Sequence, residues 1–96
     1  NTAVGTDALT ANTSGWKNTA VGYHALKGNL TGLANSSFGH LSSANITTGG
    51  YNVAVGLGAL YDTTTGSFNV ATGASSLRGN TTGSNNLPHQ VLITPH

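Results

Sequence analysis

Charge is what this sequence lacks most. Of its 96 residues, three are Lys or Arg and two are Asp or Glu, so charged residues make up 5%, against roughly 25% in an average soluble domain. No basic surface can form that would neutralise a row of phosphates, so nucleic acid is not an expected partner. Ionised catalytic groups are equally scarce, and we expect no enzymatic activity.

Cysteine and methionine are absent, and proline occurs only twice. The chain therefore has neither a disulfide framework nor a thiolate metal site. No apolar run approaches the ~20 residues of a membrane-spanning helix, and membrane insertion is not expected. The chain begins at Asn1 without Met, in register with its own repeat. We expect it to be a processed or excised segment.

What the sequence does contain is a repeat of seventeen residues. Residues 1–85 divide without insertion or deletion into five repeats, and residues 86–96 break the pattern. The repeats read NTAVGTDALTANTSGWK, NTAVGYHALKGNLTGLA, NSSFGHLSSANITTGGY, NVAVGLGALYDTTTGSF and NVATGASSLRGNTTGSN. We number the positions of the repeat 1 to 17 and call the residues that share a position a column.

Three columns never vary. Invariant glycine at columns 5 and 15 predicts two corners where the backbone needs a positive φ or a close approach. Gly58 stands outside both columns, and we expect no such requirement there. Invariant asparagine at column 1 predicts a ladder of stacked side-chain amides. The predicted corners are Gly5, Gly15, Gly22, Gly32, Gly39, Gly49, Gly56, Gly66, Gly73 and Gly83, and the predicted ladder is Asn1, Asn18, Asn35, Asn52, Asn69 and Asn86.

The fold predicted from this repeat is an all-β parallel β-solenoid with one 17-residue coil per repeat. No segment between glycines reaches the ~12 residues of a marginal helix. Two apolar pieces, Ala3-Val4 and Ala8-Leu9 in the first repeat, predict two short strands per coil. Seventeen residues are too few for ankyrin, tetratricopeptide or propeller units. They suit a coil that stacks on the next at about 4.8 Å.

The predicted core is thin, because alanine fills much of it. Repeat stacks gain stability from their neighbours, so we expect several chains to share a core, most simply as a homotrimer. The third repeat differs from the others: Phe38, Ser42 and Ser43 replace Val, Ala and Leu, and Leu41 is expected to turn inward in compensation. Residues 86–96 are expected to form a capping strand or a connector.

The unit NxAVGxxAL, closed by NTTG, resembles known repeats. It occurs at Asn1–Gly5 with Ala8-Leu9 and at Asn52–Gly56 with Ala59-Leu60, and Asn80–Gly83 supplies the closing motif. These residues resemble the YadA-like head repeats of trimeric autotransporter adhesins and the related repeats of phage tail fibres and bacterial surface fibres. The resemblance covers residues 1–85. It implies a homotrimer of parallel β-rolls that acts on a cell surface or virion as a rigid spacer or adhesive head.

Few residues could carry chemistry. Asp7 and His24 share column 7 in successive repeats and are expected to touch as a surface pair. The serine of that column, Ser75, stands three repeats beyond His24, roughly 14 Å away at the β-strand spacing, so no catalytic triad forms. The four histidines fall in different columns or in the tail, and we expect no metal site. No phosphate-binding or calcium-binding motif is present, so no cofactor is expected.

The aromatic residues are the candidate ligand contacts: Trp16, Tyr51, Tyr61 and Phe68. They could stack on surface glycans or pack between protomers, and Arg78 is expected to lie over Tyr61. Two alternatives to a spacer stay open: a carbohydrate- or receptor-binding adhesin head, and a subunit of an end-to-end filament. Ice binding is disfavoured, since the paired threonines are adjacent and point to opposite faces. N-glycosylation sequons begin at Asn12, Asn29, Asn35, Asn45 and Asn80.

Overall fold

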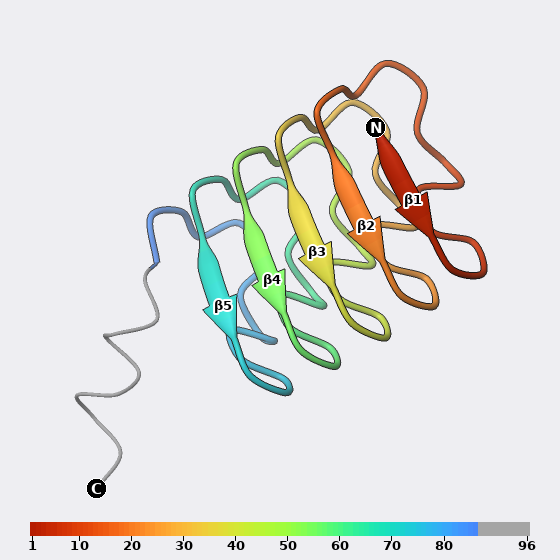
Figure 1. Cartoon of the computed structure of the whole chain (residues 1–96). Helices are drawn as coiled ribbons and strands as arrows, with labels where there is room; N and C mark the ends of the chain where they lie inside the picture. Colours follow the sequence, from red (N-terminus) through yellow and green to blue (C-terminus); the bar gives the residue numbers. More distant parts are fainter. Residues whose placement is uncertain (87–96) are drawn as a thin grey trace, which may run out of the picture.

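The computed structural model describes residues 1–86 as a stack of β-coils (Figure 1). Each repeat contributes one three-residue strand: β1 (Thr2–Val4), β2 (Thr19–Val21), β3 (Ser36–Phe38), β4 (Val53–Val55) and β5 (Val70–Thr72). The strands form one parallel sheet in the order β1-β2-β3-β4-β5, and Thr2 pairs with Thr19, its equivalent in the next repeat. The predicted all-β solenoid with a 17-residue coil is confirmed. The strand or connector predicted for the tail lies outside the described residues.

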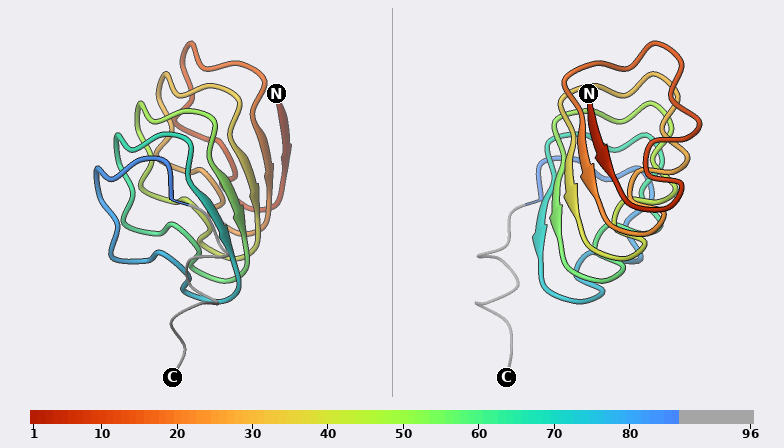
Figure 2. Two further views of the ribbon diagram at one scale, coloured as in Figure 1. Left: turned by 90° about the vertical axis from the view of Figure 1, so that its left-hand side faces the viewer. Right: turned by 45° about the vertical axis from the view of Figure 1, so that its right-hand side comes forward.

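The sheet has one buried and one outward face. The middle residue of β2, β4 and β5 points inward, where Ala20, Ala54 and Ala71 are fully buried or nearly so. Its two neighbours point outward, because side chains alternate along a strand. The rest of each coil returns through turns on the opposite side of the stack (Figure 2). Residues 1–86 contain no helix long and apolar enough to span a bilayer.

The prediction of a second strand in each coil is wrong. The Ala-Leu piece lies in a turn in which column 7 and column 9 both have left-handed backbone, with φ of 58° at Asp7 and 56° at Leu9. This alternation curls the chain so that Ala8 and Leu9 point into the core. Coils are still joined here, because the column-9 amide donates to the column-8 carbonyl of the next coil, as from Leu26 to Ser42 at 3.1 Å. Such bonds offset the strain of left-handed backbone.

The two glycine columns are required for different reasons. Gly5 has φ +123°, and a Cβ there would lie 2.7 Å from the Gly22 carbonyl oxygen. Gly15 has no positive φ, but a Cβ would collide with the Gly32 carbonyl oxygen. The expectation for Gly58 is wrong, since it has φ +69°. It belongs to column 7, where the other coils hold Asp, His, Leu and Ser in that conformation.

The core consists of two apolar clusters separated by a polar layer. One cluster lies in the first two coils, with Leu26, and reaches Ile46 of the third; the other joins the last two coils and includes Leu60. Between them, the Ser37 and Ser42 hydroxyls lie 2.5 Å apart in the buried interior of the third coil. The expectation that Leu41 turns inward is wrong. Leu41 lines a groove on the outside, and Ile46 fills the third coil instead.

Candidate binding surfaces

The asparagines of column 1 are structural. Each Oδ1 accepts a hydrogen bond from the backbone N–H of the next asparagine at 2.9 to 3.1 Å. Each Nδ2 from Asn1 to Asn69 donates to the column-15 glycine carbonyl of its own coil at 2.8 to 2.9 Å. One side chain therefore closes its coil and joins it to the next. Because Asn18, Asn35, Asn52 and Asn69 are fully buried or nearly so, this ladder offers nothing to a ligand.

A second ladder runs along column 12 and is interrupted. Asn29 donates through Nδ2 to Asn12 Oδ1 at 2.9 Å, and Asn80 donates to the Gly83 carbonyl at 3.0 Å. In the third coil this column holds Ile46, which has no donor. The buried Asn29 Oδ1 consequently finds no partner among the described residues, a costly arrangement for a buried amide.

The four candidate aromatic contacts do not form one site. Tyr51 and Phe68 share column 17 and stack with ring centroids 5.0 Å apart and planes 1° apart, each about half exposed. Trp16 stands two coils before Tyr51 and has the Lys17 ammonium 4.7 Å from its ring centroid. Tyr61 belongs to column 10, in the turn segment, and Arg78 lies over its ring at 4.7 Å, as the column spacing predicts.

The Asp7–His24 pair forms, with 3.2 Å between Oδ2 and Nε2. Tyr23 stacks on the His24 ring at 3.7 Å between centroids, and His40 meets Tyr23 edge-on at 4.9 Å. Among residues 1–86, no three His, Cys, Asp or Glu side chains lie close enough together to hold a metal ion.

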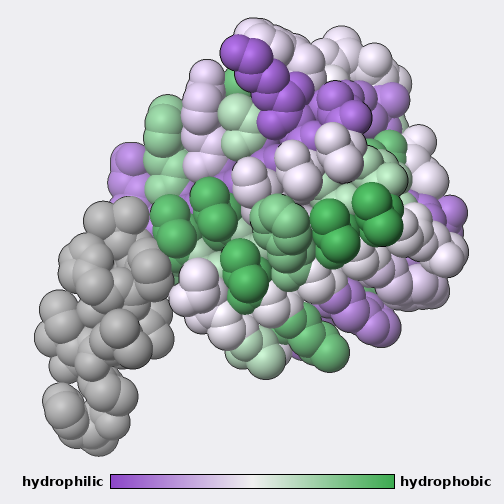
Figure 3. Space-filling model, in the orientation of Figure 1, coloured by the Kyte–Doolittle hydropathy of each residue, from purple (hydrophilic) through white to green (hydrophobic). Residues whose placement is uncertain are grey.

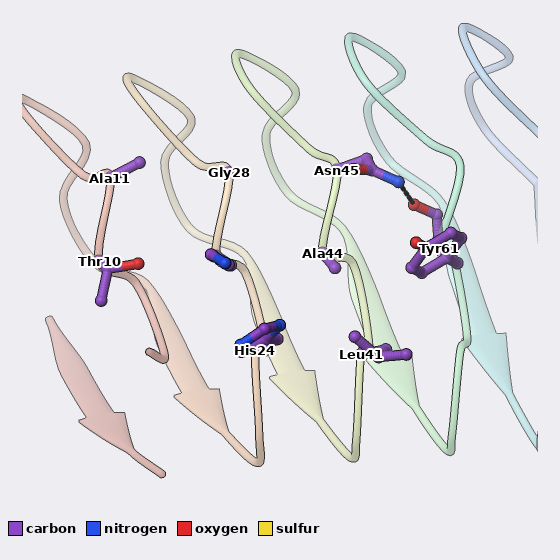
Figure 4. A pocket seen from close by; sticks show the side chains of 9 residues that line it. Thr10, Ala11, His24, Gly28, Leu41, Ala44, Asn45 and Tyr61 are labelled. Atoms are coloured by element: carbon purple, nitrogen blue, oxygen red, sulfur yellow. Dashed lines mark hydrogen bonds between the residues drawn. The ribbon is translucent and has the colours of Figure 1, made fainter. Parts of the chain in front are cut away.

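An open groove of ≈ 620 Å³ crosses the turn segments of the first four coils (Figure 4). Thr10 and Tyr61 stand at its two ends along the stack, with Gly28 and Ala44 between them. At one end Asn45 Nδ2 donates to the Tyr61 carbonyl oxygen at 2.9 Å. The remaining lining residues are Ala11, His24, Lys27 and Leu41.

Sequence reasoning identified Tyr61 and His24 but missed the groove. The groove lies where columns 10 and 11 hold their smallest residues in the middle of the stack, Ala44 and Gly28 respectively. That interruption is visible in the aligned repeats. Whether these small residues leave a groove depends on which columns face outward, and the left-handed turns decide this.

The outward face of the sheet carries a continuous apolar surface. Figure 3 shows a hydrophobic band running across the strands in the view of Figure 1. Its column-4 residues include Val4, Phe38 and Val55, with 57%, 40% and 42% of their surfaces exposed. Leu57 of column 6 borders them at 53%. Columns 2 and 4 hold no charged residue in any repeat.

Comparison of the chain with protein-family models, with curated proteins and with solved structures found no match.

Proposed function

We propose that this chain is a structural repeat segment of an extracellular fibre, in which it self-associates through the outward face of its sheet and acts as a rigid spacer. The observation that carries the proposal is the uncharged apolar band over β1–β5. Exposed apolar patches of this continuity are typical of interaction sites. The resemblance to adhesin-head and tail-fibre repeats supports the same role, and with it a place on a cell surface or virion.

The width of the band favours more than one neighbour. Strands of three residues stacked five high make a strip about 10 Å wide and 24 Å tall. One flat contact on this strip would bury far less than the ≈ 800 Å² per partner of a stable complex. A closed arrangement around the band lets each chain contact two others at once, and a homotrimer is the smallest such arrangement.

A spacer has no use for a reactive site, and the buried asparagines of column 1 are used within the fold itself. The column-1 asparagines bond to glycine carbonyls and to one another, and the single ion pair among the described residues is Asp7–His24. We therefore include in the proposal that the segment is not an enzyme and holds no cofactor.

The experiment is native mass spectrometry of the full chain beside two lysine variants. Val55→Lys places a charge in the middle of the band, whereas Thr65→Lys places the same charge at an exposed turn outside it. We expect a trimer for the parent and for Thr65→Lys, and a shift to monomer for Val55→Lys. A monomeric parent, or a Val55→Lys variant that assembles like the parent, would contradict the proposed interface.

A further inference from the structure

The groove owes its shape to one change in column 10. This column reads Thr10, Lys27, Ala44, Tyr61 and Arg78, so long side chains stand on either side of Ala44. Arg78 covers one face of the Tyr61 ring at 4.7 Å. Because these residues follow one another along the stack, the other face of Tyr61 looks across Ala44 into the groove.

The gap has the dimensions of a ring-shaped ligand. Lys27 and Tyr61 are two coils apart, or about 9.6 Å at the usual spacing between strands. Neighbouring residues of the column are separated by half that distance and leave no such room. Gly28, which also lines the groove, adds no side chain to it, and its backbone packs closely on the next coil, since a Cβ there would lie 2.9 Å from the Ala44 carbonyl oxygen.

Some polar groups around the gap have no partner among the described residues. Lys27 forms no ion pair among the described residues, and its side chain is exposed. Asn45 uses Nδ2 within the protein and leaves Oδ1 as an acceptor. No carboxylate lines the groove, since neither Asp7 nor Asp62 is among its lining residues. Asp7 pairs instead with His24 at 3.2 Å.

From these features we propose that the groove binds a saccharide that carries a carboxylate. The C–H face of the sugar ring stacks on Tyr61, the carboxylate pairs with Lys27, and a ring hydroxyl donates to Asn45 Oδ1. A shallow groove with one aromatic platform, one cation and one amide matches both the apolar and the polar sides of such a ligand. This inference goes beyond the spacer role and does not depend on it, because the groove lies over the turns and the proposed interface lies over the sheet.

The test is to titrate the full chain with four probes and to measure binding by calorimetry and by saturation-transfer NMR. N-acetylneuraminic acid and galacturonic acid carry both ring and carboxylate, galactose carries only the ring, and acetate carries only the carboxylate. We expect both acidic sugars to bind at least about tenfold more tightly than galactose or acetate. If acetate bound as tightly as the acidic sugars, the groove would be an anion site only. If galactose bound as tightly as they do, Lys27 would have no role in binding. If no sugar bound, the proposal would be overturned.

Three variants locate the binding. Lys27→Gln should weaken binding of the acidic sugars by about tenfold, whereas Lys17→Gln, the same change outside the groove, should leave it unaltered. Ala44→Tyr should abolish binding by filling the gap, and it should fold because coil four already carries Tyr61 in this column. Circular dichroism and native mass spectrometry show whether each variant still folds and assembles, so that a loss of binding can be told from a loss of structure. Unchanged affinity in folded Lys27→Gln or Ala44→Tyr would overturn the assignment.

Discussion

Each coil is closed by one asparagine side chain. In the middle of the stack, Asn52 bonds to the carbonyl of Gly66, to Oδ1 of Asn35 and to the backbone N–H of Asn69. Aspartate would lose the two donated bonds, and glutamine would place its amide one methylene too far. The invariance of this column is therefore explained by backbone geometry without any ligand.

Removing one asparagine of this ladder should strongly destabilise the fold. Asn52→Ala deletes four buried hydrogen bonds, the fourth being donated by Asn69 Nδ2 to Asn52 Oδ1, and leaves their partners unsatisfied. We therefore expect a loss of about 3 kcal/mol or more in the free energy of unfolding. Asn45→Ala removes one exposed bond to Tyr61 and should cost under about 1 kcal/mol. Urea denaturation followed by circular dichroism measures both, and similar midpoints would rule out the structural role assigned to Asn52.

Two glycines two residues apart allow a sharper comparison. Gly56 has φ +131°, and a Cβ would lie 2.6 Å from the Gly73 carbonyl carbon, whereas at Gly58 the nearest atoms are 3.7 Å away. Gly56→Ala should cost on the order of 3 kcal/mol. Gly58→Ala should cost about 1 kcal/mol, the ordinary strain of left-handed alanine. Thermal melts of the two variants check this, and a Gly58→Ala variant as damaged as Gly56→Ala would contradict it.

At the scale of the element, the third coil shows how a repeat tolerates change. It loses the column-9 leucine at Ser43 and gains an isoleucine at column 12, Ile46, so that apolar volume moves within the coil. It also exchanges two alanines for the hydrogen-bonded pair Ser37 and Ser42. The unpartnered oxygen of Asn29 is one consequence of this rearrangement.

If the two changes compensate, they should be coupled energetically. Ile46→Asn alone should cost about 2 kcal/mol, because a buried side chain is lost. Ser43→Leu alone should overpack the coil by a similar amount. The double variant restores leucine at column 9 and gives column 12 the asparagine found in the first, second and fifth repeats, so that Asn29 gains a partner. Its loss of stability should be smaller than the sum of the two single losses by at least about 1 kcal/mol. Strict additivity in a double-mutant cycle would show that Ser43 and Ile46 vary independently.

The sequence predicts how the coils repeat and stack, but it does not predict the path of the backbone within each coil. The period, the β1–β5 strands and the asparagine ladder follow from columns that repeat without a gap. The left-handed turn does not, because Leu9, Leu26 and Leu60 occupy a conformation that leucine avoids. There the hydrogen bonds between coils override local preference. The groove was missed for the same reason, since its columns face outward only through this turn.

At the scale of the whole molecule, the thin core ties folding to assembly. Its buried apolar side chains in residues 1–86 are mostly alanine, with Leu9, Leu26, Leu60 and Ile46 as the larger ones. We expect the melting temperature to rise with protein concentration, as it does when only the assembled form is folded. Differential scanning calorimetry over a hundredfold range of concentration checks this. A concentration-independent melt of a folded monomer would contradict the proposed association.

The most direct test of an interchangeable coil is to remove one. Deleting residues 52–68 takes out one complete repeat and joins Tyr51 to Asn69 in register. We expect this variant to fold and assemble as the parent does, with a stack shorter by about 4.8 Å in small-angle scattering. Deleting residues 52–67 instead shifts every later column by one and turns its inward side chains outward, so this chain should fail to fold beyond the deletion. Equal folding of the two variants, or loss of the fold in the first, would contradict the solenoid of interchangeable 17-residue coils.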